Sequence, residues 1–142
     1  MKRPIVFLLA LLLSLPAAAE GLPSLDAARA LTDAVMADID AGKVREGLAR
    51  MRSHIDTPVA EFDSQIGQVE SQMPMIRERY GEPTGHEFLD AERVGDSLAQ
   101  YVYLQKYRRH FMVWRFTFYR ASDDWVVNGW AYDDRAEPLF AD

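Results

Sequence analysis

Residues that could do chemistry are scattered along this 142-residue chain without forming a recognised catalytic motif. The three histidines, His54, His86 and His110, lack the close spacing of a metal site. The sequence has no Gly-x-Ser-x-Gly elbow for a serine nucleophile and no cysteine for a thiol nucleophile. We therefore assign no catalytic residue, no metal ligand and no cofactor from the sequence.

One basic cluster stands out in this acidic chain. Lys106, Arg108, Arg109 and His110 gather around an expected hairpin tip. They could form a small docking site for an anionic partner. The alternative is a solvated turn whose charges discourage edge aggregation, and the frequency of charged turns favours it.

The first nineteen residues have the pattern of a secretory signal peptide. Lys2 and Arg3 precede an apolar run that ends in three alanines, so cleavage is expected after Ala19. We expect a periplasmic or secreted protein with one domain over residues 20–142. Retention as an uncleaved anchor is the alternative, but the uncharged run is shorter than the roughly 20 residues that span a bilayer.

The composition limits the classes of partner. Without cysteine the exported fold has no disulfides, so its core must hold it together. The formal net charge is −6, and cleavage would make it more negative by removing Lys2 and Arg3. An overall acidic field disfavours nucleic acid and anionic membrane as partners, and no stable membrane anchor is expected after processing.

Apolar residues at spacings of three and four predict three helices in the first half. The first begins near Ser24 and ends near Gly42, and the second covers 43–53. The third begins after Thr57 and ends at Gly81, and it has the longest periodic pattern in the chain.

The second half is rich in Val, Tyr, Phe and Trp and predicts four strands. They cover about 84–93, 97–107, 110–120 and 124–132, with connections short enough for antiparallel hairpins. Helices followed by a four-stranded meander indicate an α+β fold with three N-terminal helices packed on a curved antiparallel sheet.

Hairpin register then sorts side chains between the two sheet faces. We expect Lys106 to pair with Phe111 and Phe118 to pair with Trp125. The helix-covered face then carries Tyr101, Tyr103, Met112, Trp114, Phe116, Phe118 and Trp125. The outer face carries Val102, Leu104, Phe111, Val113, Arg115, Thr117, Tyr119, Val126, Asn128, Trp130 and Tyr132.

That outer face is too apolar for a sheet surface open to water. Its mixture of aromatic, Arg, Thr and Asn side chains is typical of a partner surface. We expect a homodimer or another protein to contact Val113, Arg115, Tyr119, Trp130 and Tyr132. The alternative is that the C-terminal segment 137–142 folds back across this face.

The amino-acid sequences of the expected strands resemble those of a known superfamily. Tyr80-Gly81-Glu82-Pro83, Tyr101-Val102-Tyr103, the run from Trp114 to Tyr119 and the run from Asp124 to Gly129 are similar to small exported domains of the nuclear transport factor 2-like superfamily. The resemblance covers about residues 25–133. It implies a cone-like sheet wrapped around a long helix, and dimerisation through the sheet.

The resemblance also implies a pocket inside the cone. A small apolar ligand would contact Tyr101, Tyr103, Trp114, Phe116 and Trp125, and we expect a non-catalytic binding or interaction module. Some members are isomerases or dehydratases with an acidic base beside tyrosines, which is the alternative function. Asp63 and Asp90 are the candidate acids, and either would need burial to act as a base.

Overall fold

The computed structural model describes residues 18–141, so most of the expected signal peptide lies outside the described residues. Three helices come first: α1 (Leu25–Asp40), α2 (Val44–Ala49) and α3 (Val59–Tyr80), with a 3-10 turn, η1 (Arg52–His54), before α3. Four strands follow: β1 (Pro83–Val94), β2 (Leu98–Tyr107), β3 (Phe111–Arg120) and β4 (Trp125–Asp133). A last 3-10 turn, η2 (Glu137–Leu139), precedes the C-terminus. Within 18–141, no helix is both long and apolar enough to cross a bilayer.

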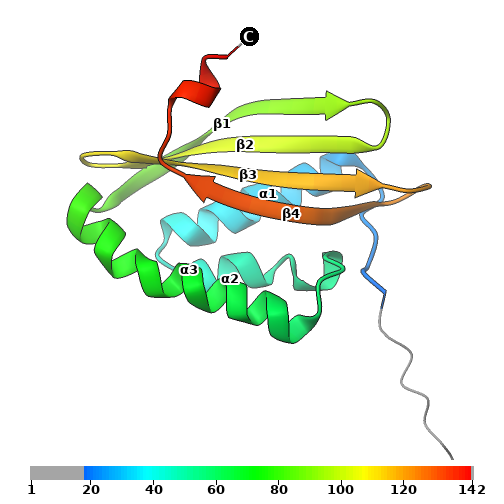
Figure 1. Cartoon of the computed structure of the whole chain (residues 1–142), viewed down its shortest axis with the longest axis horizontal. Helices are drawn as coiled ribbons and strands as arrows, with labels where there is room; N and C mark the ends of the chain where they lie inside the picture. The colour runs from blue at the N-terminus through cyan, green and yellow to red at the C-terminus, as the bar shows by residue number, and fades with distance from the viewer. Residues whose placement is uncertain (1–17, 142) are drawn as a thin grey trace, which may run out of the picture.

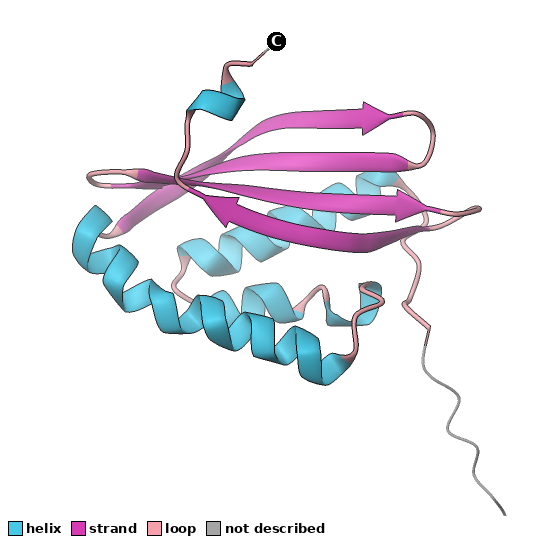
Figure 2. Ribbon diagram, viewed as in Figure 1, coloured by secondary structure: helices cyan, strands magenta, loops and turns pink. Residues whose placement is uncertain are grey.

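The molecule has two layers, and the α+β prediction is confirmed. Figure 1 shows the three helices on one side of the sheet and the C-terminal segment on the other. The sheet is an antiparallel meander in the order β1-β2-β3-β4 and is not closed, so β1 and β4 are both edge strands. Figure 2 shows the long strands lying across the helical layer.

The first and third helices form where the sequence pattern places them, whereas α2 ends at Ala49, short of the predicted 43–53. Ser24 caps α1 by accepting a hydrogen bond from the Ala27 N–H at 3.1 Å. Gly81 ends α3 with a positive φ of 87°, a conformation that favours glycine. The buried side chains of α3 are Phe62, Ile66, Val69 and Ile76, and they face the core.

The register of the β2–β3 hairpin is confirmed. Lys106 lies opposite Phe111, Tyr103 opposite Trp114, and Tyr101 opposite Phe116. The short turn and the strict alternation of side chains leave this hairpin one favourable register.

The predicted register of the β3–β4 hairpin is wrong. Phe118 lies opposite Val127, and Trp125 lies opposite Arg120. A β-bulge follows, because Thr117 pairs with Gly129 and Asn128 is an extra residue in β4. One extra residue moves every later side chain of the strand to the other face.

Trp130 and Tyr132 are therefore on the helix-covered face, not on the outer face where the sequence analysis placed them. They lie opposite Phe116 and Trp114, respectively, and pack against the core. This corrects two of the five interface candidates.

The other three interface candidates lie on the outer face. Val113 is fully buried there, Arg115 forms an ion pair with Asp133 at 2.7 Å, and Tyr119 is exposed. The C-terminal segment crosses above this face and encloses a hollow of about 660 Å³, which Val102 and Arg115 line from the sheet and Leu139 and Phe140 from the segment. The segment thus covers part of the outer face, as the alternative prediction had it.

Candidate functional site

The five residues predicted to line a ligand pocket instead fill the core. Tyr103, Trp114 and Phe116 are fully buried, and Tyr101 and Trp125 are nearly so. The structure brings them together between the helices and the sheet, but their side chains pack against one another. The Tyr103 and Phe116 ring centroids, for example, are 5.8 Å apart in an edge-on arrangement.

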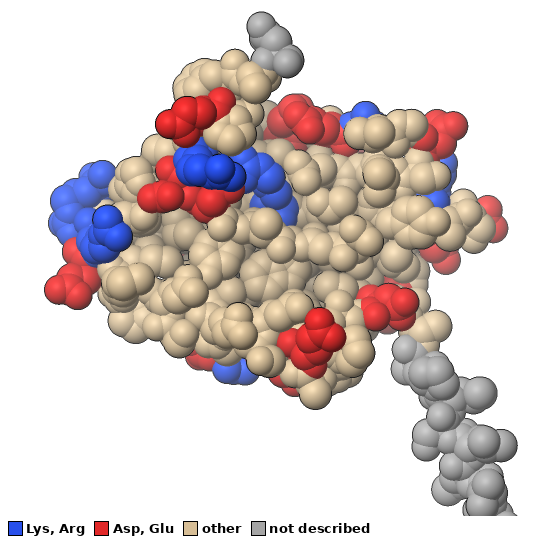
Figure 3. All heavy atoms as spheres, in the orientation of Figure 1, with Lys and Arg blue, Asp and Glu red and all other residues tan. Residues whose placement is uncertain are grey.

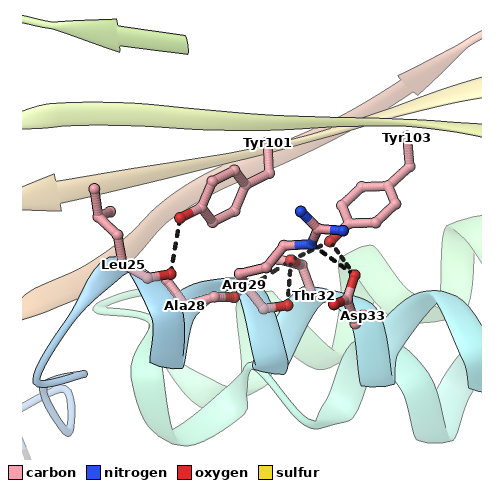
Figure 4. A network of polar contacts seen from close by, with 7 residues as sticks. All are labelled: Leu25, Ala28, Arg29, Thr32, Asp33, Tyr101 and Tyr103. Carbon is pink, nitrogen blue, oxygen red and sulfur yellow. Dashed lines mark hydrogen bonds and ion pairs between the residues drawn. The ribbon is translucent and has the colours of Figure 1, made fainter. Parts of the chain in front are cut away.

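The two tyrosines fasten α1 to the sheet. In Figure 4 both rings point from β2 toward α1. The Tyr101 hydroxyl donates to the Leu25 carbonyl at 2.8 Å, and the Tyr103 hydroxyl donates to Asp33 at 2.7 Å and contacts the Thr32 hydroxyl at 2.6 Å. Burial raises the pKa of both tyrosines above its ordinary value, so both hydroxyls stay neutral donors.

Asp33, the acid that accepts from the Tyr103 hydroxyl, does not have the burial that a catalytic base needs. Asp33 is half-exposed and is paired with Arg29 at 2.9 Å. The two candidate acids of the sequence analysis lie elsewhere: Asp63 pairs with Arg52, and Asp90 is exposed in β1 opposite Val102 on the outer face. The contacts of Tyr101 and Tyr103 thus favour a structural role for both.

A second polar group lies farther along the same layer. His86 Nδ1 contacts the Asp40 carboxylate, and the buried Gln105 amide donates to Asp40 at 3.4 Å. The Gln105 carbonyl oxygen accepts from Trp114 Nε1 at 2.9 Å and from the Tyr107 hydroxyl at 3.2 Å. Burial raises the pKa of Tyr107 to about 12, so it too remains a donor. This group satisfies buried polar atoms between α1 and the sheet.

The basic cluster of the β2–β3 turn has a structural role. The Arg109 N–H donates to the Tyr80 carbonyl at 2.8 Å, and the Arg109 side chain donates to the carbonyls of Glu78 and Arg79. These are carbonyls of the last turn of α3, where a cation also interacts favourably with the helix dipole. The turn therefore caps α3, an interpretation that the sequence analysis did not include.

The candidate site is a groove between α3 and β4, with a volume of about 320 Å³. Its lining comes from α3 (Gln65, Gln68, Val69 and Gln72), from β4 (Asn128, Gly129, Trp130 and Tyr132) and from the segment between η1 and α3 (Ile55 and Thr57). None of these residues is acidic or basic. We call this hollow the α3–β4 groove.

Stacked aromatic rings form one wall of the α3–β4 groove. The rings of Trp130 and Tyr132 stack on buried Trp114, with centroids 6.5 and 4.9 Å from it. The Tyr132 hydroxyl donates to Gln72 Oε1 at 2.6 Å and so links the aromatic wall to α3. Burial also raises the pKa of Tyr132, so this wall stays uncharged.

Amide side chains form the opposite wall. Gln65, Gln68 and Gln72 follow the helical spacing of three and four residues, so they line one side of α3 beside buried Val69. Figure 3 shows the strip between β4 and α3 as almost free of charged atoms, while Lys, Arg, Asp and Glu gather around it. The α3–β4 groove can therefore offer hydrogen bonds and aromatic contact without a net charge.

Other hollows differ in chemistry. One of about 450 Å³ lies beside α2, α3 and β2 and is lined by Lys43, Arg45, Glu70 and Arg77 as well as apolar groups. Arg45 and Glu70 form an ion pair there. Partly paired charges at a surface are ordinary, so this hollow gives less indication of a ligand than the α3–β4 groove does.

The sequence analysis missed the α3–β4 groove because the β4 register was wrong. Two signals were present in the sequence. Glycine inside a strand pattern, here Gly129 after Asn128, is typical of a bulge. The glutamines of α3 also follow helical spacing, but their significance depends on which strand they face.

Comparisons with models of protein families, with curated proteins and with solved structures find no match to this chain.

Proposed function

We propose that this chain is an exported, non-catalytic binding module that holds an uncharged ligand in the α3–β4 groove. The observation that carries the proposal is the chemistry of the lining: aromatic rings on one side, amides on the other, and no charged group among the lining residues. Pockets that combine apolar surface with a few convergent polar groups are typical ligand sites.

Export is supported by the pattern of residues 1–19 and by the contacts that follow it. The Glu20 N–H donates to the Ser53 carbonyl at 2.6 Å, and the Glu20 carbonyl contacts His54 Nδ1 at 2.8 Å. The residue directly after the expected cleavage point is thus fastened to the domain. A periplasmic or secreted location belongs to the same proposal.

A binding role is preferred to an isomerase or dehydratase. The interior that would have to hold a substrate is filled by Tyr101, Tyr103, Trp114, Phe116 and Trp125. The order of helices and strands supports the resemblance to the nuclear transport factor 2-like superfamily, which we include in the proposal. Within such a fold, the ligand site of this chain lies between α3 and the sheet edge.

The three tryptophan indoles provide a direct test. Trp130 lines the α3–β4 groove, whereas Trp114 and Trp125 are buried in the core. We expect an uncharged ligand to shift the indole N–H signal of Trp130 in two-dimensional NMR spectra and to leave the other two nearly unchanged. The panel comprises neutral sugars, capped dipeptides and small aromatic amides, and Trp130→Phe assigns the signal.

A matched pair of α3 variants locates the binding. Gln68→Arg places a long cation in the α3–β4 groove and should weaken binding at least tenfold. Ser64→Arg adds the same side chain at an exposed position of α3 that does not line the groove, and should leave affinity unchanged. Equal effects of the two variants, or no shift of Trp130 across the panel, would refute the proposal.

A further inference from the structure

The free edge of β4 can be mapped from its backbone pairing. Trp125 exchanges two hydrogen bonds with Leu22, at 2.7 and 2.8 Å, so its N–H and C=O point away from β3. Successive residues of a strand point their backbone groups to alternate sides. In β3, Phe118, Phe116 and Trp114 point their backbone groups to the same side as Arg120, the residue opposite Trp125. The residues of β4 opposite these three are Val127, Trp130 and Tyr132, respectively. The backbone groups of Trp130 and Tyr132 therefore also point away from β3.

Part of this edge is already covered by the chain itself. Leu22 pairs with Trp125, and Ile55 forms a bridge with Val127. Within residues 18–141, no hydrogen bond outside the strand ladder joins the N–H or C=O of Trp130 or Tyr132 to another group. The edge thus accepts two extended segments at one end and stays open over the next two outward-facing residues.

The open part of the edge borders the α3–β4 groove. Trp130 and Tyr132 supply both the outward backbone groups and the aromatic wall. On the α3 side, the side-chain nitrogens of Gln65, Gln68 and Gln72 have no hydrogen-bond partner among the described residues. Backbone and side-chain donors and acceptors therefore face the same space.

We propose that the occupant of the α3–β4 groove is an extended, uncharged peptide segment that adds to the edge of β4. One residue of the segment exchanges two hydrogen bonds with Trp130, and the residue two positions along exchanges two with Tyr132. The two backbone sites are about 6.8 Å apart, the repeat of a strand. This inference rests on the proposed function, because it names the ligand class of the same site.

The surroundings select the chemistry of the peptide. Alternate side chains of the added strand turn toward the glutamines and aromatic rings, and neutral polar, apolar or aromatic groups suit them. An acidic peptide is disfavoured, because the chain has a net negative charge and the groove lining has no cation to pair with it. Proline is excluded at the positions that donate to β4, because it has no N–H.

The test begins with a phage-displayed library of seven-residue peptides selected against the protein obtained by expressing the full chain. The strongest recovered peptide is synthesised with acetyl and amide ends and added to isotope-labelled protein. We expect the amide protons of Trp130 and Tyr132 to exchange at least tenfold more slowly with peptide bound. The amide of Ala131 serves as an internal control, because it points toward Arg115 of β3 and should change little.

A second measurement examines the peptide. N-methylation at every second residue should weaken binding at least tenfold, and methylation at the intervening residues should have little effect. Uniform tolerance of N-methylation, or recovery of no peptide whose binding Gln68→Arg weakens, overturns the inference. Protection of Trp130 and Tyr132 that rises with protein concentration alone also overturns it, in favour of a second copy of the chain at the same edge.

Failure of the inference is distinguishable from failure of the proposed function. If a neutral sugar or other small molecule shifts the Trp130 indole and Gln68→Arg abolishes the shift, the α3–β4 groove is a binding site. Unchanged amide exchange at Trp130 and Tyr132 in that case overturns only the peptide assignment.

Discussion

At the scale of single residues, Gln105 joins two core side chains through hydrogen bonds. Its side chain is almost fully buried, and its carbonyl oxygen is the acceptor for both Trp114 and Tyr107. Gln105→Leu retains the apolar packing but leaves the buried Trp114 N–H without an acceptor. We expect the free energy of unfolding to fall by about 1–3 kcal/mol, measured by urea titration.

Gln100→Leu is the matched control for this substitution. Gln100 is on the same strand but faces the outer side, where its amide donates to Thr117 at 3.0 Å beside solvent. Water can replace that hydrogen bond, so the loss should be smaller than about 0.5 kcal/mol. An equal loss for the two variants would contradict the role assigned to Gln105.

At the scale of elements, the bulge in β4 determines on which face of the sheet Trp130 and Tyr132 lie. Deletion of Asn128 should remove the bulge and give unbroken alternation, with Gly129 still opposite Thr117 and the side chains of Trp130 and Tyr132 still on the helix-covered face. We expect the free energy of unfolding to change by less than about 1 kcal/mol, since the two aromatic residues keep their packing. Calorimetry measures the change, and unchanged quenching of tryptophan fluorescence by acrylamide reports that the aromatic side chains stay covered.

Asn128→Ala is the control for the deletion, because it removes the amide but retains the extra residue. It should leave quenching unchanged and cost little stability, since the Asn128 side chain is exposed. If the deletion variant instead exposes its tryptophans to acrylamide, then Asn128 is not the extra residue of β4 and the bulge does not fix the faces.

The two hairpins show why the sequence predicted one register and missed the other. Between β2 and β3 the pairing runs without a register shift, so a correct pair at the turn fixes all later pairs. Between β3 and β4 a single inserted residue reverses the faces halfway along the strand. Whether β4 adopts this bulge depends on how its side chains pack against α3. The hydrophobic alternation of β4 alone does not reveal that packing.

The same limit explains why the predicted site residues fill the core and do not line a pocket. Tyr101, Tyr103, Trp114, Phe116 and Trp125 were correctly placed on the helix-covered face. Whether a covered face is packed or hollow depends on the fit of side chains from several elements. That fit follows from tertiary structure. The sequence therefore predicted which face these side chains share, but not that they fill the space beneath it.

For the whole molecule, the outer face keeps an exposed apolar row at one end. Val94, Leu98 and Tyr119 lie opposite one another on successive strands and are 70%, 39% and 41% exposed. We propose that the homodimer forms through this row. Leu98→Glu should raise the dimer dissociation constant at least tenfold, because it places like charges across a twofold contact.

Sedimentation equilibrium over a range of protein concentrations measures this effect. Gln68→Glu adds the same charge in the α3–β4 groove and should leave dimerisation through the outer face unchanged. A monomer at all concentrations for the unaltered chain, or dissociation caused by Gln68→Glu and not by Leu98→Glu, would refute the outer-face dimer.

The pairing of Leu22 with Trp125 has a consequence for when the domain can fold. Synthesis begins at the amino end, so Leu22 emerges before the three helices, and Trp125 emerges only after β3. Contacts between residues so distant in sequence form slowly, because a long loop must close first. The sheet edge at which they meet can close only after the three helices and the first three strands have been made. The segment that contains Leu22 therefore stays unpaired, and this end of the sheet edge unprotected, until the fourth strand has been made.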